Sequence, residues 1–290
     1  MPQNANAPRV IVTGASGYIG RHVVSALLDR GCRVLAVART LPPADIDPRA
    51  ETCEIDVLDI NADVDPLFAD SRDILVHLAW QDGFSHQAPS HMLTLSSHFR
   101  FLTEAAKRVS RLAVLGTMHE IGYWEGGVTA ETPTNPRSLY GIAKDALRRS
   151  LFLASSNETE LCWLRSYYIY GDDRRNKSIF TRLLDAEESG QASIPFTMGR
   201  QKYDFIHVRD LAEQIAVVAM TPGISGILNT SSGVPVALAE KVELFIEENG
   251  LNVRLDYGAF PERAYDSPAI WGVADDVRQL VSAARASHEQ

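Results

Sequence analysis

The sequence predicts an α/β protein in which a doubly wound parallel sheet is joined to a smaller C-terminal lobe. In the first half of the chain, short apolar segments rich in Val, Leu and Ile alternate with segments long enough for helices, and a glycine-rich turn follows the first apolar segment. Short apolar segments of this composition are typical of parallel strands, because both faces of such strands are buried. Their alternation with helices is typical of βαβ units.

Most strands of the sheet are expected in the first half of the chain. Strands are expected at 9–14, 33–38, 51–55, 73–79, 111–117 and 160–166, and helices between them at 18–30, 90–109 and 138–155. The more mixed second half predicts a strand at 204–208, a Pro-containing loop at 258–271, and helices at 178–189, 209–220, 237–249 and 274–286. We therefore expect residues 1–170 mainly to form the sheet domain, and residues 171–290 mainly to form the lobe, with some elements returning to the sheet.

Charge and cysteine content exclude several classes of protein. The 290 residues are 45% hydrophobic and carry a formal net charge of −9 without a basic run, which argues against nucleic acid and anionic membranes as partners. No apolar segment is long enough to span a bilayer, and the N-terminal segment lacks the apolar core of a secretion signal. Cys32, Cys53 and Cys162 are widely spaced, which predicts no disulfide framework or metal cluster and favours the cytoplasm.

The segment TGASGYIG (13–20) follows the first strand and opens the first helix. Gly14 permits a tight turn, Gly17 lets backbone approach a phosphate, and Gly20 lets the helix pack closely on the strand. The free N–H groups of the helix N-terminus then face the phosphates. A structural turn would use the same glycines, but at this position in a βαβ unit the pattern predicts a Rossmann dinucleotide-binding domain.

The end of the second strand indicates which nicotinamide cofactor binds. An acidic residue there would bond the adenosine ribose and favour NAD, but Arg39 occupies this position, and no Asp or Glu lies between Arg33 and Pro43. A guanidinium suits a 2′-phosphate, so we expect NADP(H) rather than NAD(H), the alternative being a solvated arginine. Asp56 and Val57, after the third strand, are expected near the adenine.

Tyr140 and Lys144 lie one turn apart on the helix that follows the fifth strand, and Thr117 ends that strand. The three side chains are expected to converge beside the nicotinamide. Tyr140 can protonate an alkoxide as hydride reaches a carbonyl carbon, Lys144 can lower the pKa of the phenol and bond the ribose, and Thr117 can hold the carbonyl oxygen. An isolated YxxxK would more often be a surface pair, but here it accompanies the glycine turn.

These motifs resemble those of the extended short-chain dehydrogenases/reductases, the NAD-dependent epimerase/dehydratase family. The resemblance covers residues 10 to about 215 and rests on TGASGYIG, HLAW, LGTMHEIG, YGIAK and the LRSYYIYG and DFIHVRDLA runs. It implies a nucleotide-diphosphate sugar as substrate and a homodimer formed through the helices at 90–109 and 138–155. GTMHEIGYWEG, YGIAKDALRR and YDSPAIWG are most similar to 4-ketoreductases of 6-deoxysugar biosynthesis, which act on dTDP- or GDP-linked sugars.

The resemblance also implies contacts at matching positions. Cofactor contacts are expected from Gly14, Ser16, Gly17, Tyr18, Ile19, Gly20, Leu78, Ala79, Trp80, Tyr140, Lys144 and Tyr167. Substrate contacts are expected from Met118, His119 and Tyr168.

The chain departs from the family pattern at two positions. Tyr168 replaces an Asn of the sixth-strand motif, and Tyr203 replaces an Arg that often binds substrate phosphates. Other cations must then bind the phosphates, and we expect this role for Arg182 and Arg200, with Lys202 and Arg263 as further candidates; each is also a candidate for a solvated surface charge.

Two histidines invite metal or acid–base interpretations. His77 lies within an apolar strand and is expected to be a packed, hydrogen-bonded residue, whereas His119 is a candidate substrate contact. No histidine has metal-ligand spacing, so no metal is predicted. Trp80, Phe84 and Tyr123 are expected near the sugar or in simple packing.

The sequence favours NADPH-dependent reduction of the 4-keto group of a nucleotide sugar. The alternatives are an epimerase or 4,6-dehydratase with a recycled cofactor and, less favoured, a non-catalytic NADP-sensing regulator, which would commonly lose the Tyr/Lys pair. A dehydratase needs an additional acid and base, and family dehydratases have Asp and Glu directly after the Thr. Met118 and His119 occupy these positions, and Glu120 comes one residue too late, so its side chain is expected to point elsewhere.

Overall fold

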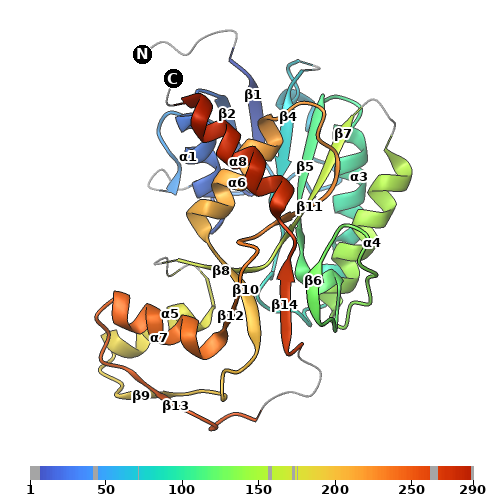
Figure 1. Ribbon diagram of the computed structural model, residues 1–290. Helices are drawn as coiled ribbons and strands as arrows, with labels where there is room; N and C mark the ends of the chain where they lie inside the picture. Colours follow the sequence, from blue (N-terminus) through green and yellow to red (C-terminus); the bar gives the residue numbers. More distant parts are fainter. Residues whose placement is uncertain are drawn as a thin grey trace.

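The computed structural model describes residues 7–41, 45–70, 72–155, 159–171, 174, 176–261 and 267–288. Within these ranges, seven parallel strands form one sheet in the order β11-β7-β5-β4-β1-β2-β3 (Figure 1). The strands are β1 Arg9–Thr13, β2 Arg33–Ala38, β3 Glu51–Glu54, β4 Ile74–His77, β5 Arg111–Thr117, β7 Glu160–Ser166 and β11 Gly226–Thr230. The strand order reverses between β1 and β4, and ligands of open α/β sheets bind at such a switch point.

Helices cover both faces of this sheet because alternate residues of each strand are apolar on opposite sides. Val10 and Val12 of β1 belong to a core shared with one set of helices, and Ile11 belongs to a core shared with the other. The first set is α1 Gly20–Asp29, α6 Val208–Met220 and α8 Asp275–His288. The second set is α3 Leu95–Ala105 and α4 Leu139–Ala154, against which the short α2 Ser90–Leu93 packs. The fold class predicted from the sequence is confirmed.

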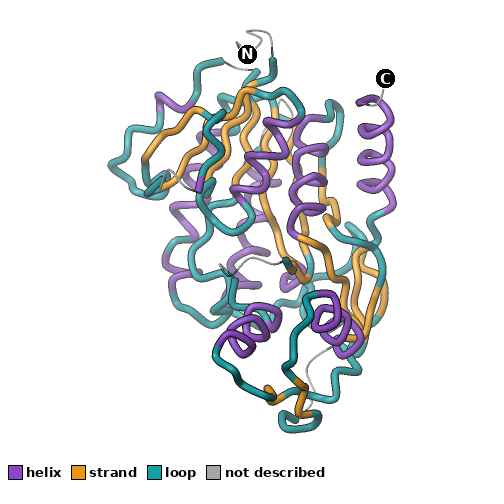
Figure 2. Tube along the Cα trace, turned by 90° about the vertical axis from the view of Figure 1, so that its left-hand side faces the viewer, coloured by secondary structure: helices purple, strands orange, loops and turns teal. Residues whose placement is uncertain are grey.

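A smaller lobe lies below the carboxyl ends of the strands (Figures 1 and 2). Its core is rich in aromatic residues and includes Phe180, Phe196, Phe205 and Phe245. Its elements are β6 Gly126–Val128, β8 Tyr168–Tyr170, α5 Ile179–Glu188, β9 Ser193–Pro195, β10 Lys202–His207, β12 Pro235–Ala237, α7 Leu238–Glu248, β13 Arg254–Asp256 and β14 Ala269–Gly272. The chain returns to the large sheet through α6, β11 and α8. The predicted boundary near residue 170 between the sheet domain and the lobe stays a prediction.

Two expected elements differ from the structure. The helix expected at 90–109 is two helices, which meet at Thr94, and the second ends at Ala105. The Thr94 hydroxyl bonds the carbonyl of Ser90, a local contact that competes with a regular helix. The loop expected at 258–271 contains the start of β14. This strand is too short for its sequence to show an alternation of apolar and polar residues, and it is recognised only by its pairing with β6 and β10. Among the described residues, no helix has the length and apolar character needed to cross a membrane.

Candidate functional site

A cavity of about 410 Å³ lies at the switch point of the sheet, and we call it the switch-point cavity. Nine residues of the predicted cofactor site line it: Gly14, Ser16, Gly17, Arg39, Asp56, Val57, Leu78, Ala79 and Trp80. They come from the ends of β1, β2, β3 and β4, which the parallel pairing brings to one edge. Thr40, Asp59, Gln81, Thr94 and Ser97 also line it and were not singled out from the sequence.

The turn after β1 has the backbone geometry that the glycines predict. Gly14 has a φ of +71°, and a Cβ at this position would lie 2.6 Å from the backbone nitrogen of Ala79. Only glycine therefore fits between the turn and the end of β4. The N–H of Gly17 donates to the carbonyl of Gly14 at 3.0 Å, which closes the turn directly before α1 begins at Gly20. The cavity wall is thus backbone at the point where a dinucleotide phosphate would approach.

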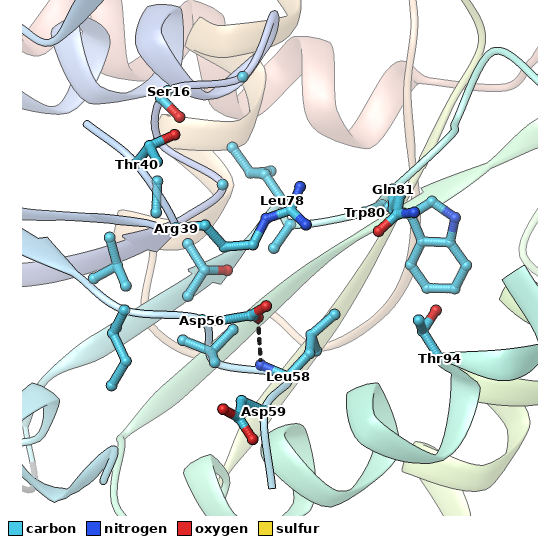
Figure 3. A pocket seen from close by; sticks show the side chains of 18 of the residues that line it. Ser16, Arg39, Thr40, Asp56, Leu58, Asp59, Leu78, Trp80, Gln81 and Thr94 are labelled. Atoms are coloured by element: carbon cyan, nitrogen blue, oxygen red, sulfur yellow. Dashed lines mark hydrogen bonds between the residues drawn. The ribbon is translucent and has the colours of Figure 1, made fainter. Parts of the chain in front are cut away.

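Arg39 and two carboxylates share the switch-point cavity (Figure 3). Arg39 is exposed, and among the described residues it has no hydrogen-bond or ion-pair partner. Asp56 accepts the N–H of Leu58 at 3.0 Å, and Asp59 accepts the N–H of Asn61 at 2.9 Å, so each carboxylate stabilises its own turn. At the end of β2 itself, Arg39 therefore offers a ligand a positive charge, with the carboxylates of Asp56 and Asp59 in the same cavity.

Thr117, Tyr140 and Lys144 meet where β5 ends, as predicted. Ser138 caps α4 by accepting the N–H of Gly141 at 3.1 Å, and Tyr140 and Lys144 follow on one face of the helix. The Thr117 side chain lies close enough to the Tyr140 phenol to oppose the effect of burial on its pKa. The Lys144 ammonium donates to the carbonyl of Leu115 at 2.7 Å and lies 3.8 Å from the centre of the Trp80 ring. Trp80 also lines the switch-point cavity, so this corner adjoins it.

Burial determines the protonation behaviour of the pair. It raises the pKa of Tyr140 well above its usual value, and the Thr117 side chain only partly opposes this shift. It lowers the pKa of Lys144 to about 7, against the opposing charge of Glu120. The expected lowering of the Tyr140 pKa by Lys144 is therefore not found, because the ammonium is directed to the Leu115 carbonyl and the Trp80 ring. The phenol is therefore protonated at neutral pH, as an unshifted tyrosine would be.

Five histidines lie near these groups, namely His77, His86, His91, His98 and His119. His77 is hydrogen-bonded to Thr13 at 2.8 Å and to His98 at 3.0 Å, so its expected role as a packed residue is confirmed. His98 stacks on Trp80, with ring centres 4.3 Å apart. His86 stacks on Tyr140, and its carbonyl accepts the N–H of Tyr140 at 2.9 Å. The loop after β4 therefore reaches α4, which the sequence did not indicate.

A second cavity, of about 470 Å³, lies between the corner and the lobe, and we call it the lobe cavity. Of the predicted substrate contacts, Met118, His119 and Tyr168 line it. Its other lining residues are His86, Gln87, Gly122, Tyr123, Arg137, Ser138, Tyr203, Ser267 and Ile270. Arg137 is the one cation among these described lining residues, and its guanidinium lies 6.0 Å from the centre of the Tyr123 ring.

Other predicted contacts lie outside both cavities. Arg182 is exposed on α5, and Arg200 is exposed between β9 and β10, so the geometry does not favour the phosphate-binding role predicted for them. Lys202 is likewise exposed, and Arg263 lies outside the described residues. Phe84 is 51% exposed and lines neither cavity.

Six predicted cofactor contacts do not line the switch-point cavity: Tyr18, Ile19, Gly20, Tyr140, Lys144 and Tyr167. Tyr18 and Ile19 precede α1, which begins at Gly20. Tyr167 is buried, and its hydroxyl donates to the side-chain oxygen of Asn229 at 3.0 Å, which directs the ring toward β11 rather than toward either cavity. A side-chain contact of Tyr167 with a cofactor is therefore not favoured.

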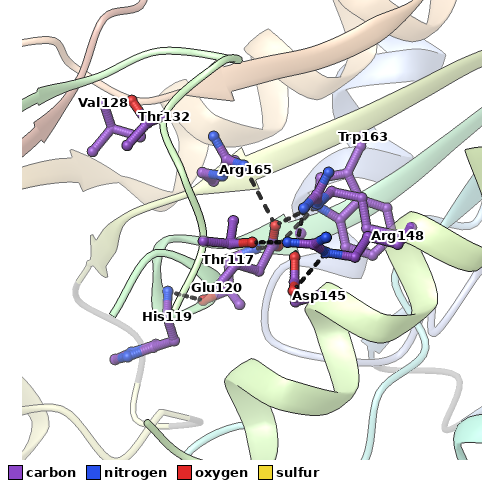
Figure 4. Close-up of polar contacts among 12 residues, drawn as sticks. Thr117, His119, Glu120, Val128, Thr132, Asp145, Arg148, Trp163 and Arg165 are labelled. Carbon is purple, nitrogen blue, oxygen red and sulfur yellow. Dashed lines mark hydrogen bonds and ion pairs between the residues drawn. The ribbon is translucent and has the colours of Figure 1, made fainter. Parts of the chain in front are cut away.

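Glu120 points away from the lobe cavity, as expected (Figure 4). It is fully buried behind Thr117, whose N–H donates to its carboxylate at 2.8 Å. Its further partners are Trp163, Arg148 and Arg165.

The model of the NAD dependent epimerase/dehydratase family matches residues 10–228. A dTDP-6-deoxy-L-talose 4-dehydrogenase (NAD(+)) of Aggregatibacter actinomycetemcomitans is 43% identical over 91% of this chain and 98% of its own length. A dTDP-6-deoxy-L-talose 4-dehydrogenase (NAD(P)(+)) of Kitasatospora kifunensis is 28% identical over 86% of this chain and 81% of its own. The solved structure of MoeE5 in complex with UDP-glucose and NAD superposes with a TM-score of 0.76 at 26% identity, covering 94% of this chain and 92% of MoeE5.

Replacing Lys144 with Met should make stability less dependent on pH between about 7 and 10. The pKa of Lys144 is lowered to about 7 in the folded protein, so the unfolded state binds the extra proton across this interval and wild-type stability rises with pH. The variant lacks this contribution, which is up to about 1.4 kcal/mol per pH unit. Thermal unfolding at several pH values checks the difference.

Lys107→Met is the matched control, because the Lys107 side chain is 71% exposed and its loss should preserve the wild-type pH dependence. Parallel pH curves for wild type and Lys144→Met would contradict the lowered pKa.

Proposed function

Because the chain belongs to the NAD dependent epimerase/dehydratase family, as its motifs predicted, we propose that this NAD(P)-dependent oxidoreductase reduces the 4-keto group of a nucleotide-diphosphate 4-keto-6-deoxysugar. The reverse reaction is the 4-dehydrogenation for which its 43% identical relative is named, on a dTDP-linked sugar. The observation that carries the proposal is the placement of Tyr140 and Lys144 on one face of α4, against Thr117 at the end of β5 and Trp80 of the switch-point cavity. A GDP-linked sugar is the less favoured form of the same substrate.

The nicotinamide supplies the hydride when it is bound. The chain supplies the proton: Tyr140 donates its phenolic proton to the carbonyl oxygen of the sugar, and the Thr117 hydroxyl donates a hydrogen bond to the same oxygen. Lys144 lies one turn from Tyr140 and would bond the nicotinamide ribose when the cofactor is bound. The adjoining cavities hold the dinucleotide on the sheet side of this corner and the sugar on the lobe side.

The residues after Thr117 argue against a 4,6-dehydratase. Met118 cannot transfer a proton, and Glu120 is directed into the core rather than into the lobe cavity. Burial and the neighbouring His86 lower the pKa of His119 to about 3, so its imidazole is neutral and is a weak base. An epimerase would need no group beyond Tyr140 and a retained cofactor, so the release of oxidised cofactor distinguishes the two activities.

We also propose that the protein is a cytoplasmic homodimer. Five large apolar side chains are exposed on α2 and α4, namely Met92 at 40%, Leu93 at 78%, Ile142 at 40%, Phe152 at 37% and Leu153 at 88%. Exposed apolar groups gathered on neighbouring helices are typical of a protein–protein interface. The three unpaired cysteines suit a reducing compartment.

The purified protein, mixed with a dTDP-4-keto-6-deoxyhexose and reduced cofactor, should oxidise one cofactor for each 6-deoxysugar formed. Tyr140→Phe keeps the ring and removes the proton donor, so turnover should fall at least about 100-fold while cofactor affinity stays within about twofold. Loss of nicotinamide absorbance and product formation are measured together. Interconversion of two nucleotide sugars without net cofactor oxidation would instead establish an epimerase.

Arg39→Ala should weaken NADPH binding more than NADH binding. The unpaired guanidinium in the switch-point cavity supports a contact with the 2′-phosphate, whose loss costs roughly 1.5–3 kcal/mol, or about 10- to 100-fold in Kd. Arg72→Ala, at an exposed arginine outside the cavity, is the control. Equal effects on both cofactors, or a wild-type preference for NADH, would overturn the NADP assignment. A preference for NADH would agree with the name of the 43% identical relative, which specifies NAD(+).

Arg137→Ala should raise the KM for the nucleotide sugar about tenfold or more with little change in kcat, because we assign this cation of the lobe cavity to the substrate diphosphate. Arg182→Ala is the matched comparison, since Arg182 is an exposed arginine of the lobe outside the cavity. Steady-state kinetics with saturating cofactor give both constants. If the KM rises in Arg182→Ala and not in Arg137→Ala, the diphosphate is bound by Arg182, as the sequence predicted.

A further inference from the structure

Glu120 is a fully buried carboxylate directly behind the group that would hold the substrate carbonyl. It ends the 3₁₀ turn Met118–Glu120, which continues from β5. One carboxylate oxygen accepts the N–H of Thr117 and the indole N–H of Trp163, each at 2.8 Å. The other lies 3.2 Å from Nε of Arg148 and 3.6 Å from Nη2 of Arg165. The carboxylate therefore joins the end of β5 to α4 and to β7 (Figure 4).

The contact with Thr117 fixes the orientation of its hydroxyl. The Thr117 oxygen accepts the N–H of His119 at 3.3 Å while Glu120 accepts the N–H of Thr117, which is a reciprocal capping box. With the oxygen already accepting one bond, the hydroxyl hydrogen remains for Tyr140 or a substrate oxygen. Replacement of the Glu120 carboxylate would release the backbone on which this orientation depends.

The contact with Arg148 fixes the helix that carries the proton donor. Tyr140, Lys144 and Arg148 are spaced by four residues and form one column on α4. Arg148 also pairs with Asp145 at 2.5 Å, so its guanidinium is held between two carboxylates. The N-terminal end of the helix touches the same turn, since a Cβ at Gly141 would lie 2.3 Å from the carbonyl oxygen of His119.

We propose that Glu120 is the positioning residue of the reduction, because it holds the Thr117 hydroxyl and the Tyr140–Lys144 face of α4 at a fixed separation. This inference rests on the proposed function. Small displacements of reacting groups cost large factors in rate, about 100-fold for 1 Å. Glu120 touches neither cavity and acts only through its neighbours.

The charge of Glu120 adds a second effect on the same corner. Charged or titratable groups interact with it from α4, as Lys144 and Arg148, from β7, as Arg165, and from the residue directly after β7, as Tyr167; Tyr140 is also within electrostatic range. Burial raises the pKa of Glu120, whereas Arg165 and Arg148 oppose the shift. The Glu120 charge raises the pKa of Lys144 against the effect of burial. Loss of that charge would therefore make Lys144 easier to deprotonate.

Glu120→Gln should lower kcat about tenfold or more, with the KM of sugar and cofactor within about threefold. We assign the alkaline limb of the kcat–pH profile to deprotonation of Lys144, so this limb should move to lower pH in the variant. Glu120→Asp restores the negative charge on a side chain that is one methylene shorter. The alkaline limb of the pH profile should therefore return to its wild-type position, whereas kcat should stay low. The Asp variant also serves if the Gln variant does not fold, since an unchanged kcat in Glu120→Asp would overturn the positioning role.

Glu160→Gln is the matched control for a purely structural effect. Glu160 pairs with Arg111 at the opposite ends of the same two strands, β7 and β5, so its loss should lower the unfolding temperature and leave kcat and the pH profile unchanged. A Glu120→Gln variant that is folded with wild-type kcat and pH profile would overturn the proposal, as would equal losses of kcat in both variants.

A wild-type protein that reduces no 4-keto sugar would refute the proposed function, but the coupling of Glu120 to Lys144 could still be tested. The titration of Lys144, followed by NMR of ¹³C-labelled lysine, tests the coupling without substrate. A lower midpoint in Glu120→Gln than in Glu160→Gln supports the inference, and equal midpoints overturn it.

Discussion

The parallel pairing of β1, β4 and β5 is the constraint from which the arrangement of the site follows. Thr13 pairs with His77, and His77 pairs with Val114, so β1 and β4 end at the same level of the sheet. β5 continues from Val114 to Thr117, which pairs with Ser166 of β7. The edge of the sheet is therefore stepped. The switch-point cavity lies over the lower step, and the longer strands carry Thr117 beyond it toward the lobe cavity.

The step between the cavities is made of polar groups with little access to water. His77, Lys144, Glu120 and Arg165 are each at most 3% exposed. A buried charge or imidazole is tolerated only when it is paired, and each of these has at least one partner from another element of the sheet or its helices. Because breaking one buried pair costs about 3–5 kcal/mol, the members hold one another in place. Catalytic geometry here is thus a property of a core, in contrast to sites built on mobile loops.

What the sequence predicts here is local or periodic. The glycine turn and the strands could be predicted because φ angles and two-faced burial act within a few residues, and the Tyr140–Lys144 spacing follows from one helical turn. Arg137 and His86 were missed because loops bring them to the lobe cavity, and the contact that fixes His86 joins it to Tyr140, far along the chain. Arg182 was singled out for its charge alone, and charge says nothing about the face of a helix that a residue occupies. Composition likewise could not predict that Glu120 is buried.

The lining of the lobe cavity bears on the kind of sugar that fits it. His86 and His119 both have pKa values lowered by burial, so at neutral pH they are uncharged donors and acceptors. Tyr168, Tyr203 and Ile270 add hydroxyl groups and apolar surface. A cavity with neutral polar groups and apolar walls recognises hydroxyls and a methyl group better than a carboxylate, which would need a cation close by. Arg137, the one cation among the described lining residues, lies at Tyr123, where the diphosphate is assigned. The division of charge within the cavity thus favours a neutral 6-deoxysugar over a uronic acid.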